Sequence, residues 1–277
     1  MKLINTIKET KDIINQAKNE NKTIGLVPTM GALHTGHISL IEKAKGMCDF
    51  IVVSDFVNPS QFAVGEDFDK YPRTIDEDFK KCEAAGANLL FAPSANEIYS
   101  KGYSSWIEVQ GIASLLEGEF RPTHFKGVTT ICGKLFNITS PKYAFFGQKD
   151  FQQVSVVKKM VIDLNMPLEI ISCPIIRDTD GIALSSRNKY LSEETRIRAL
   201  HISKAIFKAK IMAQEKNPVN KILKMTFEEI KEGFPEKIDY VSIVDCDTLL
   251  PTESTHNAVL LIAAYFGGVR LIDNTLL

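Results

Sequence analysis

The sequence of 277 residues predicts an α/β fold with a mostly parallel sheet flanked by helices, followed by a smaller α+β domain. Two observations lead to this prediction. Short apolar segments alternate with segments of helical spacing up to Ile176, as in strand–helix–strand units with right-handed crossovers. Continuous apolar runs such as Ile51-Val52-Val53 are typical of strands that are buried on both faces.

The elements of the first part follow from local patterns. Apolar residues recur at helical spacing over residues 6–19, which predicts an amphipathic helix. Thr74, followed three residues later by Glu77, matches the capping box at the start of a helix over 74–85. The other expected elements are strands over 23–27 (ended by Pro28), 49–57, 87–92, 106–109 (a possible edge strand), 143–146 and 168–176, and helices over 36–45, 125–138 and 150–164.

The pattern changes after Ile176. Residues 177–181 read as a polar turn, and strand–helix alternation is not evident behind it. The expected elements there are helices over 192–215 and 218–232 and strands over 238–244 and 258–264. We therefore expect one domain over residues 1–176 and a smaller one over residues 177–277.

The composition limits the function classes. Hydrophobic residues make up 44% and charged residues 24% of the chain, and the net charge of −1 argues against wholesale nucleic-acid binding. Five cysteines without a C-x-x-C spacing indicate reduced thiols rather than a disulfide framework or a zinc site. The longest apolar run, 258–269, is shorter than the ~20 residues that span a bilayer. We expect a soluble cytoplasmic protein that binds neither nucleic acid nor membranes.

The most informative segment is Val27–His37, an apolar strand that runs through a glycine-containing turn into a helix. Open α/β sheets bind ligands at such junctions, where helix N-termini attract phosphates. Gly36 lets a phosphate approach the backbone closely, and the imidazoles of His34 and His37 can stabilise charge in a transition state. Two ordinary turn histidines are the alternative, and zinc is less favoured because no third ligand follows at a recognisable spacing.

A second strand-to-helix junction lies at residues 147–153. Lys149 at the strand end can bridge phosphates or neutralise a leaving pyrophosphate. The alternative is a surface ion pair with Asp150, which is the usual fate of such a pair.

A third polar segment, Leu184–Arg187, contains two hydroxyls and a guanidinium just after the expected domain boundary. The forked guanidinium of Arg187 suits bidentate contact with phosphate. A helix N-cap or a solvated loop is an equally good interpretation of this segment alone.

A fourth segment, residues 56–62, follows a buried strand. Asn58 and Gln61 can bond the hydroxyls or carboxylate of a small substrate, in a site from which apolar neighbours exclude water. A simple Asn-Pro turn is the alternative. Four such segments at strand ends of one sheet are much less expected by chance than any one of them.

These segments resemble the pantoate–β-alanine ligase family. The resemblance rests on VPTMGALHTGH (27–37), FVNPSQF (56–62), YPRT (71–74), RPTHFKGV (121–128), FFGQKDFQQ (145–153), LSSRN (184–188) and VRLIDN (269–274). It implies a Rossmann-like fold of the nucleotidyltransferase superfamily, with domain 1–176 binding ATP and pantoate and domain 177–277 acting as a lid. It also implies a homodimer.

The activity that the resemblance implies has two steps. The carboxylate of (R)-pantoate attacks the α-phosphate of ATP, which gives pantoyl adenylate and pyrophosphate. The amine of β-alanine then attacks the acyl group, which gives pantothenate, the coenzyme A precursor, and AMP.

The resemblance also implies roles for single residues. His34 and His37 would bind ATP phosphates, with His37 as proton donor, and Gln61 and Gln153 would hold pantoate, with Asn58 beside them. Mg²⁺ would accompany ATP on its phosphates, without a dedicated protein metal site, and Glu77 and Asp78 are candidates for its outer shell. Ser185, Ser186 and Arg187 would clamp the triphosphate from the second domain, with Lys149 on the nucleotide phosphates and Asp150 on the ribose side. The whole ATP site would comprise Met30, Gly31, Ala32, Leu33, His34, Thr35, Gly36, His37, Gly147, Gln148, Lys149, Asp150, Ile176, Leu184, Ser185, Ser186 and Arg187.

Three positions depart from the family pattern. Gln148 replaces a common Glu, where only a backbone role is expected. Asp55 stands where the strand is usually apolar, and Ser60 replaces a common Met or Leu. Ser60 would remove apolar contact with the methyl groups of pantoate, which at ~0.8 kcal/mol per buried CH₂ would weaken binding several-fold.

Two rival functions differ in their products. Another nucleotidyltransferase would build AMP into a stable product instead of releasing it. A non-catalytic nucleotide-binding module would tolerate replacement of His37 or Lys149.

Overall fold

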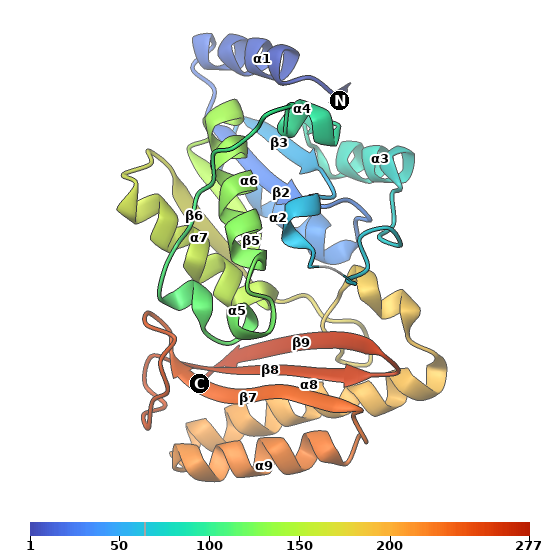
Figure 1. Cartoon of the computed structure of the whole chain (residues 1–277), viewed down its shortest axis with the longest axis vertical. Coiled ribbons are helices and arrows are strands. Elements are labelled where there is room, and N and C mark those ends of the chain that lie inside the picture. Colours follow the sequence, from blue (N-terminus) through green and yellow to red (C-terminus); the bar gives the residue numbers. More distant parts are fainter. Residues whose placement is uncertain (64) are drawn as a thin grey trace. The chain divides into compact units, whose positions relative to one another are not determined.

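The structure, a computed structural model, describes residues 1–63 and 65–277 (Figure 1). The chain forms two compact units. The N-terminal unit contains residues 1–147 and 152–173, and the C-terminal unit contains residues 148–151 and 174–277. The sequence does not predict that the short segment 148–151 groups with the second unit. A division of labour between a substrate domain and a lid stays a prediction.

The N-terminal unit is built on a six-stranded parallel sheet with the order β1-β4-β3-β2-β5-β6. Successive strands add to one side of β2 and then, from β5 on, to its other side. The switch point at which ligands bind in such sheets therefore lies between β2 and β5, at their carboxyl ends. The strands are β1 (Lys2–Ile4), β2 (Ile24–Thr29), β3 (Phe50–Asp55), β4 (Leu89–Phe91), β5 (Tyr143–Gly147) and β6 (Glu169–Cys173).

Helices cover both faces of this sheet. Helices α1 (Ile7–Asn19), α6 (His124–Thr139) and α7 (Phe151–Asp163) share one core with it, whereas α2 (Thr35–Lys45) and α3 (Ile75–Ala85) share another. Alternate residues of the same strand enter the two cores, Leu26 the first and Val27 the second. Burial on both faces explains the continuous apolar runs of the central strands. The short helical segments are η1 (Pro59–Gln61), α4 (Ala95–Ile98), η2 (Ile112–Ser114), α5 (Glu117–Phe120) and η3 (Gln148–Asp150).

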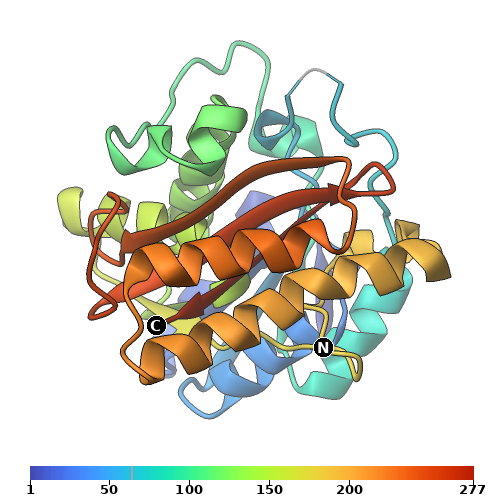
Figure 2. The same ribbon diagram turned by 90° about the horizontal axis from the view of Figure 1, so that it is seen from below.

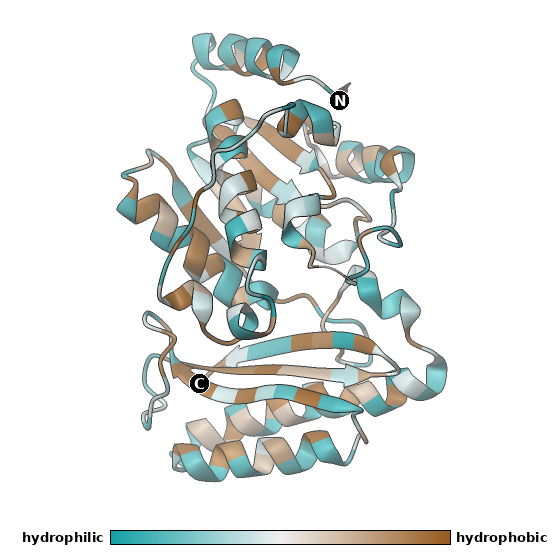
Figure 3. Ribbon diagram, viewed as in Figure 1, coloured by the Kyte–Doolittle hydropathy of each residue, from teal (hydrophilic) through white to brown (hydrophobic). Residues whose placement is uncertain are grey.

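The C-terminal unit is an antiparallel sheet with the order β7-β8-β9, made of β7 (Lys237–Asp245), β8 (Ala258–Phe266) and β9 (Val269–Leu276). Helices α8 (Glu193–Gln214) and α9 (Val219–Lys231) lie side by side against it (Figure 2). Strand β8 is hydrophobic along most of its length, as expected for the buried central strand (Figure 3). The short helix η4 (Ser186–Tyr190) precedes α8.

Two predicted strand features are wrong. Residues 106–109 form no strand, because Ile107 is held by side chains of α6: its N–H donates to Thr130 Oγ1 and its carbonyl accepts from Thr129 Oγ1. Strand β2 continues through Pro28 to Thr29. Proline is tolerated there because pairing of β2 with β5 is confined to Gly25 and Leu26.

Other differences lie at element ends. Thr74 occupies the N-cap position of α3 but makes no side-chain cap, because its hydroxyl donates to Asp78 instead. Strand β6 ends at Cys173, short of the predicted end. Strands β1 and β9 were not predicted. Within the part of the chain that the structure describes, no helix is both long and apolar enough to cross a membrane.

Candidate functional site

The loop between β2 and α2 has an unusual backbone. Gly31 has a φ of 78° and Ala32 has a φ of 51°, two consecutive left-handed residues. A Cβ atom on Gly31 would lie 2.3 Å from Asp55 Oδ1, so only glycine fits against the end of β3. Thr29 Oγ1 accepts a hydrogen bond from Gly31 N at 3.1 Å, which begins the turn.

A buried carboxylate from α3 holds this loop in place. Asp78 has no exposed surface, and its two oxygens accept hydrogen bonds from Ala32 N (2.8 Å) and Leu33 N (2.7 Å). Lys81, one turn later, donates to Leu33 O at 2.8 Å. Both oxygens of Asp78 are thereby engaged, so it shapes the loop rather than serving the outer shell of magnesium. No local sequence pattern predicts this role of Asp78.

Asp55 lies beneath the same loop. Its Oδ2 is buried without a hydrogen-bond partner. Burial, together with the neighbouring charge of Asp78, raises the pKa of Asp55 to about 7. A proton on Asp55 can be donated to the carboxylate of Asp78, which satisfies the buried oxygen and removes the repulsion between the two acids.

The two histidines stand at the N-terminus of α2. His34 is the N-cap residue, and its Nδ1 accepts from Gly36 N at 3.1 Å. His37 Nδ1 accepts from His34 N at 3.3 Å, which completes a reciprocal cap, and the ring centroids are 4.1 Å apart. Because each Nδ1 is an acceptor, each neutral ring carries its proton on Nε2. The pair therefore places two imidazoles at a helix N-terminus, a position that suits an anion.

Asn58 lies at the centre of a buried hydrogen-bond network. It is fully buried, and its Nδ2 donates to Gln61 Oε1 at 2.9 Å and to Gly127 O at 3.2 Å. Its Oδ1 accepts from Tyr99 Oη at 2.8 Å and from Ser60 Oγ at 2.9 Å. In this structure all the hydrogen-bonding capacity of Asn58 is used to build the turn, and its predicted contact with the substrate stays a prediction. The effect of Asn58 is to orient Gln61.

Gln61 is held on both its side chain and its backbone. Its carbonyl accepts from Arg121 Nη2 at 3.3 Å and faces His124 Nδ1 at 3.0 Å. Burial lowers the pKa of His124 to about 4, so the ring is neutral and donates from Nδ1. Asn58 uses the Oε1 of Gln61, and no described residue accepts from its Nε2, which leaves an N–H₂ group for a substrate oxygen.

The two adjacent glutamines of α7 have different roles. Gln152 is buried, accepting from Glu117 N and donating to Ile112 O and Leu115 O, so it fixes the loop before α6. Gln153 is partly exposed and forms no hydrogen bond with the described residues. Gln153, which was predicted to hold pantoate, is therefore the one of the two glutamines that is available for a substrate.

The other predicted phosphate-binding segments lie in the C-terminal unit. Lys149 forms no ion pair with Asp150 or any other described residue, so the surface-pair alternative is wrong. Ser185 Oγ accepts from Arg187 N at 3.3 Å and caps η4, as one alternative for this segment predicted. Ile176 O accepts from Leu184 N at 3.0 Å, which closes a hairpin just before the serines.

A family model described as pantoate–β-alanine ligase matches residues 2–276. The chain belongs to the pantoate–β-alanine ligase family. The family gives the chain its activity, the ligation of pantoate with β-alanine to form pantothenate.

Relatives and solved structures agree with this assignment over the full length of the chain. A pantothenate synthetase of Acetivibrio thermocellus is 49% identical over 100% of this chain and 99% of its own. The crystal structure of pantothenate synthetase from Thermus thermophilus superposes with a TM-score of 0.95 at 39% identity, covering 100% of this chain and 99% of that one. A pantoate–β-alanine ligase of Francisella tularensis, solved with β,γ-ATP and β-alanine, gives a TM-score of 0.84 at 36% identity over 100% and 97% of the two chains.

Two residues that depart from the ligase family pattern, Gln148 and Ser60, have hydrogen-bond partners in the structure. The Gln148 side chain, from which no role was expected, donates from Nε2 to Asn274 Oδ1 at 3.3 Å. Ser60 Oγ lies 3.0 Å from Tyr99 Oη, within the network around Asn58. The expected effect of Ser60 on pantoate binding stays a prediction.

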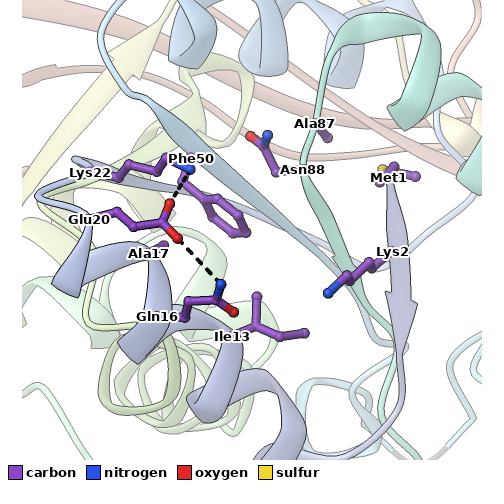
Figure 4. Close-up of a pocket in the computed structure, with 10 residues that line it drawn as sticks. All are labelled: Met1, Lys2, Ile13, Gln16, Ala17, Glu20, Lys22, Phe50, Ala87 and Asn88. Atoms are coloured by element: carbon purple, nitrogen blue, oxygen red, sulfur yellow. Dashed lines mark hydrogen bonds and ion pairs between the residues drawn. The ribbon is translucent and has the colours of Figure 1, made fainter.

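A cavity of about 340 Å³ lies at the amino ends of the strands of the six-stranded sheet, away from the loops that follow their carboxyl ends (Figure 4). Phe50 at the start of β3 and Asn88 just before β4 line it, so it lies at the amino ends of the strands. Its Glu20 pairs with Lys22 at 2.6 Å and with Gln16 at 3.3 Å. Among the described residues, no group of three or more His, Cys, Asp or Glu side chains could hold a metal ion.

Proposed function

We propose that this ligase forms pantothenate through a pantoyl adenylate. A carboxylate oxygen of pantoate forms a bond to the α-phosphorus of ATP, and the bond from that phosphorus to the bridging oxygen of the β-phosphate breaks, releasing pyrophosphate. The β-alanine nitrogen then forms a bond to the acyl carbon and loses a proton, and AMP leaves with the electron pair of the acyl–oxygen bond. Activation is needed because a free carboxylate is a poor acyl donor.

The geometry of the two histidines carries this proposal. His34 and His37 stand at the N-terminus of α2, which follows the carboxyl end of β2 beside the switch point of the sheet. Imidazole donors in that place stabilise negative charge as the phosphorus becomes pentacoordinate. His37 is the proposed proton donor, and the backbone from Met30 to Leu33 is the proposed cradle for the nucleotide.

The remaining roles follow the motif positions. Gln61 Nε2 and Gln153 hold the oxygens of pantoate in the N-terminal unit. Lys149 neutralises the pyrophosphate as it leaves, and Asp150 contacts the ribose. From the C-terminal unit, Ser185, Ser186 and Arg187 clamp the triphosphate, and closure of that unit excludes water from the adenylate.

Magnesium is proposed only as the companion of ATP. Asp78 is engaged by the loop, and no group of three or more His, Cys, Asp or Glu side chains among the described residues could hold a metal ion. Mg²⁺ then rests mainly on phosphate oxygens. When bound, it would neutralise charge on the triphosphate.

We also propose a homodimer that works in the cytoplasm. The dimer is inferred from the family resemblance, and the compartment is inferred from five cysteines that are all free. Light scattering on a size-exclusion peak tests the dimer. A mass near twice the 30.9 kDa of one chain supports it, and a mass near 30.9 kDa contradicts it.

Product analysis tests the function. The chain is incubated with ATP, Mg²⁺, pantoate and β-alanine, and nucleotides and acids are separated. We expect AMP and pantothenate in equal amounts. AMP incorporated into a stable product would instead indicate a nucleotidyltransferase, and bound but unreacted ATP would indicate a binding module.

A further inference from the structure

The dipeptide Asp273-Asn274 of β9 touches two separate segments of the C-terminal unit. Both residues are buried, with 3% and 1% exposure. Asp273 reaches the hairpin that precedes the serines, and Asn274 reaches the segment 148–151. The segment 148–151 contains Lys149 and the hairpin leads directly into Ser185, two residues to which the proposed function gives phosphate contacts.

The contacts of Asn274 surround Lys149. Its Nδ2 donates to Gln148 O and to Lys149 O, both at 2.9 Å. These carbonyls belong to the peptide groups on either side of the Lys149 Cα. Holding both peptide planes fixes the φ and ψ angles of Lys149 and so the direction of its Cβ. An amide is suited to the task because its two N–H groups match two carbonyl acceptors.

Gln148 completes the arrangement from the other side. Its Nε2 donates to Asn274 Oδ1, the side-chain atom of Asn274 that does not take part in the bonds to the two carbonyls. The side chain that departs from the family pattern thus helps to orient the amide that holds Lys149. Because Lys149 has no ion pair of its own among the described residues, its direction depends on its backbone.

Asp273 acts on the second segment in a similar way. Its two oxygens accept from Arg177 Nη1 (2.6 Å) and Nη2 (2.9 Å), and Arg177 also donates to Gly181 O at 3.2 Å. This fork closes the hairpin in which Arg177 pairs with Ala183. The chain leaves that hairpin directly into Leu184 and Ser185.

We infer that Asn274 is a positioning residue for Lys149, and that with Asp273 it lets one strand align both phosphate-contacting segments of the C-terminal unit. The inference rests on the proposed function. It does not require Asn274 to touch a substrate.

Comparison of the two half-reactions tests the inference, because Lys149 is needed only while pyrophosphate is present. Asn274→Asp keeps the size of the side chain but turns a carboxylate towards two carbonyls. We expect pantoate-dependent ATP–pyrophosphate exchange to fall about tenfold or more. Pantothenate formation from freshly prepared pantoyl adenylate and β-alanine should stay within about twofold of wild type. A purely structural fault would slow both half-reactions alike.

Two further variants keep the outcome decisive. Asn217→Asp is the matched control, since Asn217 Nδ2 also donates to a backbone carbonyl, Met212 O at 3.0 Å, but after the end of α8. Gln148→Ala removes one contact from a partly exposed residue, and we expect exchange to fall about threefold. If Asn274→Asp does not fold, Gln148→Ala decides. The inference would be overturned if the folded variants exchange pyrophosphate as fast as the Asn217→Asp control. It would also be overturned if they lose pyrophosphate exchange and pantothenate formation equally. A wild-type chain without exchange would instead refute the proposed function.

Discussion

The two edges of the six-stranded sheet make an instructive comparison. The amino edge has an evident cavity, but the charged side chains that line it are exposed, and Glu20 and Lys22, with 46% and 42% side-chain exposure, pair with each other. At the carboxyl edge, the fully buried carboxylate of Asp78 accepts hydrogen bonds from two backbone N–H groups of a strained loop. Burying a charge is costly unless hydrogen bonds compensate, so such a group marks a loop whose shape matters.

A hollow alone does not indicate a site. In the amino-edge cavity, Glu20 and Lys22 form an ion pair of the kind common between exposed side chains. At the carboxyl edge, the polar atoms shape the backbone of the loop and cap the helix on which His34 and His37 stand. The following substitutions test this contrast, in order of expected effect.

Replacing His37 by Ala should have the largest effect. It removes one proposed donor to the reacting phosphate and one half of the cap on α2, and we expect kcat/KM to fall about 10²–10³-fold. Steady-state kinetics with all three substrates measure this, with a thermal melt to confirm folding. Activity within a few-fold of wild type would place the chemistry elsewhere.

Replacing Asp78 by Ala should come next. Two backbone donors and the Thr74 hydroxyl lose a charged acceptor, so we expect the free energy of unfolding to drop by about 3 kcal/mol and the KM for ATP to rise. Asp76→Ala, an exposed acid in the same helical turn, is the control for denaturant unfolding and kinetics. Equal behaviour of the two variants would show that the buried acid does not hold the loop.

The pH dependence of stability should show a smaller effect. The pKa of Asp55 is raised from 3.8 to about 7, so the folded state binds the extra proton between these values. Its contribution to stability is therefore complete below pH 3.8 and is lost as pH rises to about 7. The groups facing it are Asp78, with Lys81 beside that acid, and Cys82.

Asp55→Asn isolates this contribution, because an amide keeps the size and cannot titrate. Between pH 5 and pH 8, wild type should lose roughly 2 kcal/mol of unfolding free energy more than the variant. Urea unfolding of both proteins at the two pH values gives the difference. A difference of zero would mean that Asp55 is ionised throughout.

The smallest effect is expected at the amino edge. Glu20→Ala breaks an exposed ion pair in the cavity, and such pairs contribute about 0–1 kcal/mol. We expect kinetic constants within twofold of wild type. A large loss of activity there would reverse the contrast between the two edges.

The sequence predicts what depends on neighbours in the chain. The parallel sheet, the long helices and the polar junctions after β2 and β5 follow from periodicity and from residues such as His34, Gly36 and His37. Lys149 and Gln153 could also be singled out, because their motifs are local. The family resemblance was carried by these same segments and is confirmed.

The contacts that position those residues could not be predicted, because their partners are remote in sequence. Asp78 meets Leu33 across 45 residues, and Asn274 meets Lys149 across 125. The partners of Asn58 could not be predicted for the same reason: Tyr99 and Gly127 bond its amide, and no local pattern reveals them. A polar residue next to a motif reads the same whether it binds a substrate or orients a neighbour.

The most direct test of the central claim is exchange of labelled pyrophosphate into ATP without β-alanine. We predict exchange that requires pantoate and is strongly reduced in His37→Ala, because the first half-reaction makes an adenylate at the carboxyl edge of the sheet. Absence of exchange with pantoate in an enzyme that still forms pantothenate would contradict the adenylate mechanism. Undiminished exchange in His37→Ala would contradict the placement of the site.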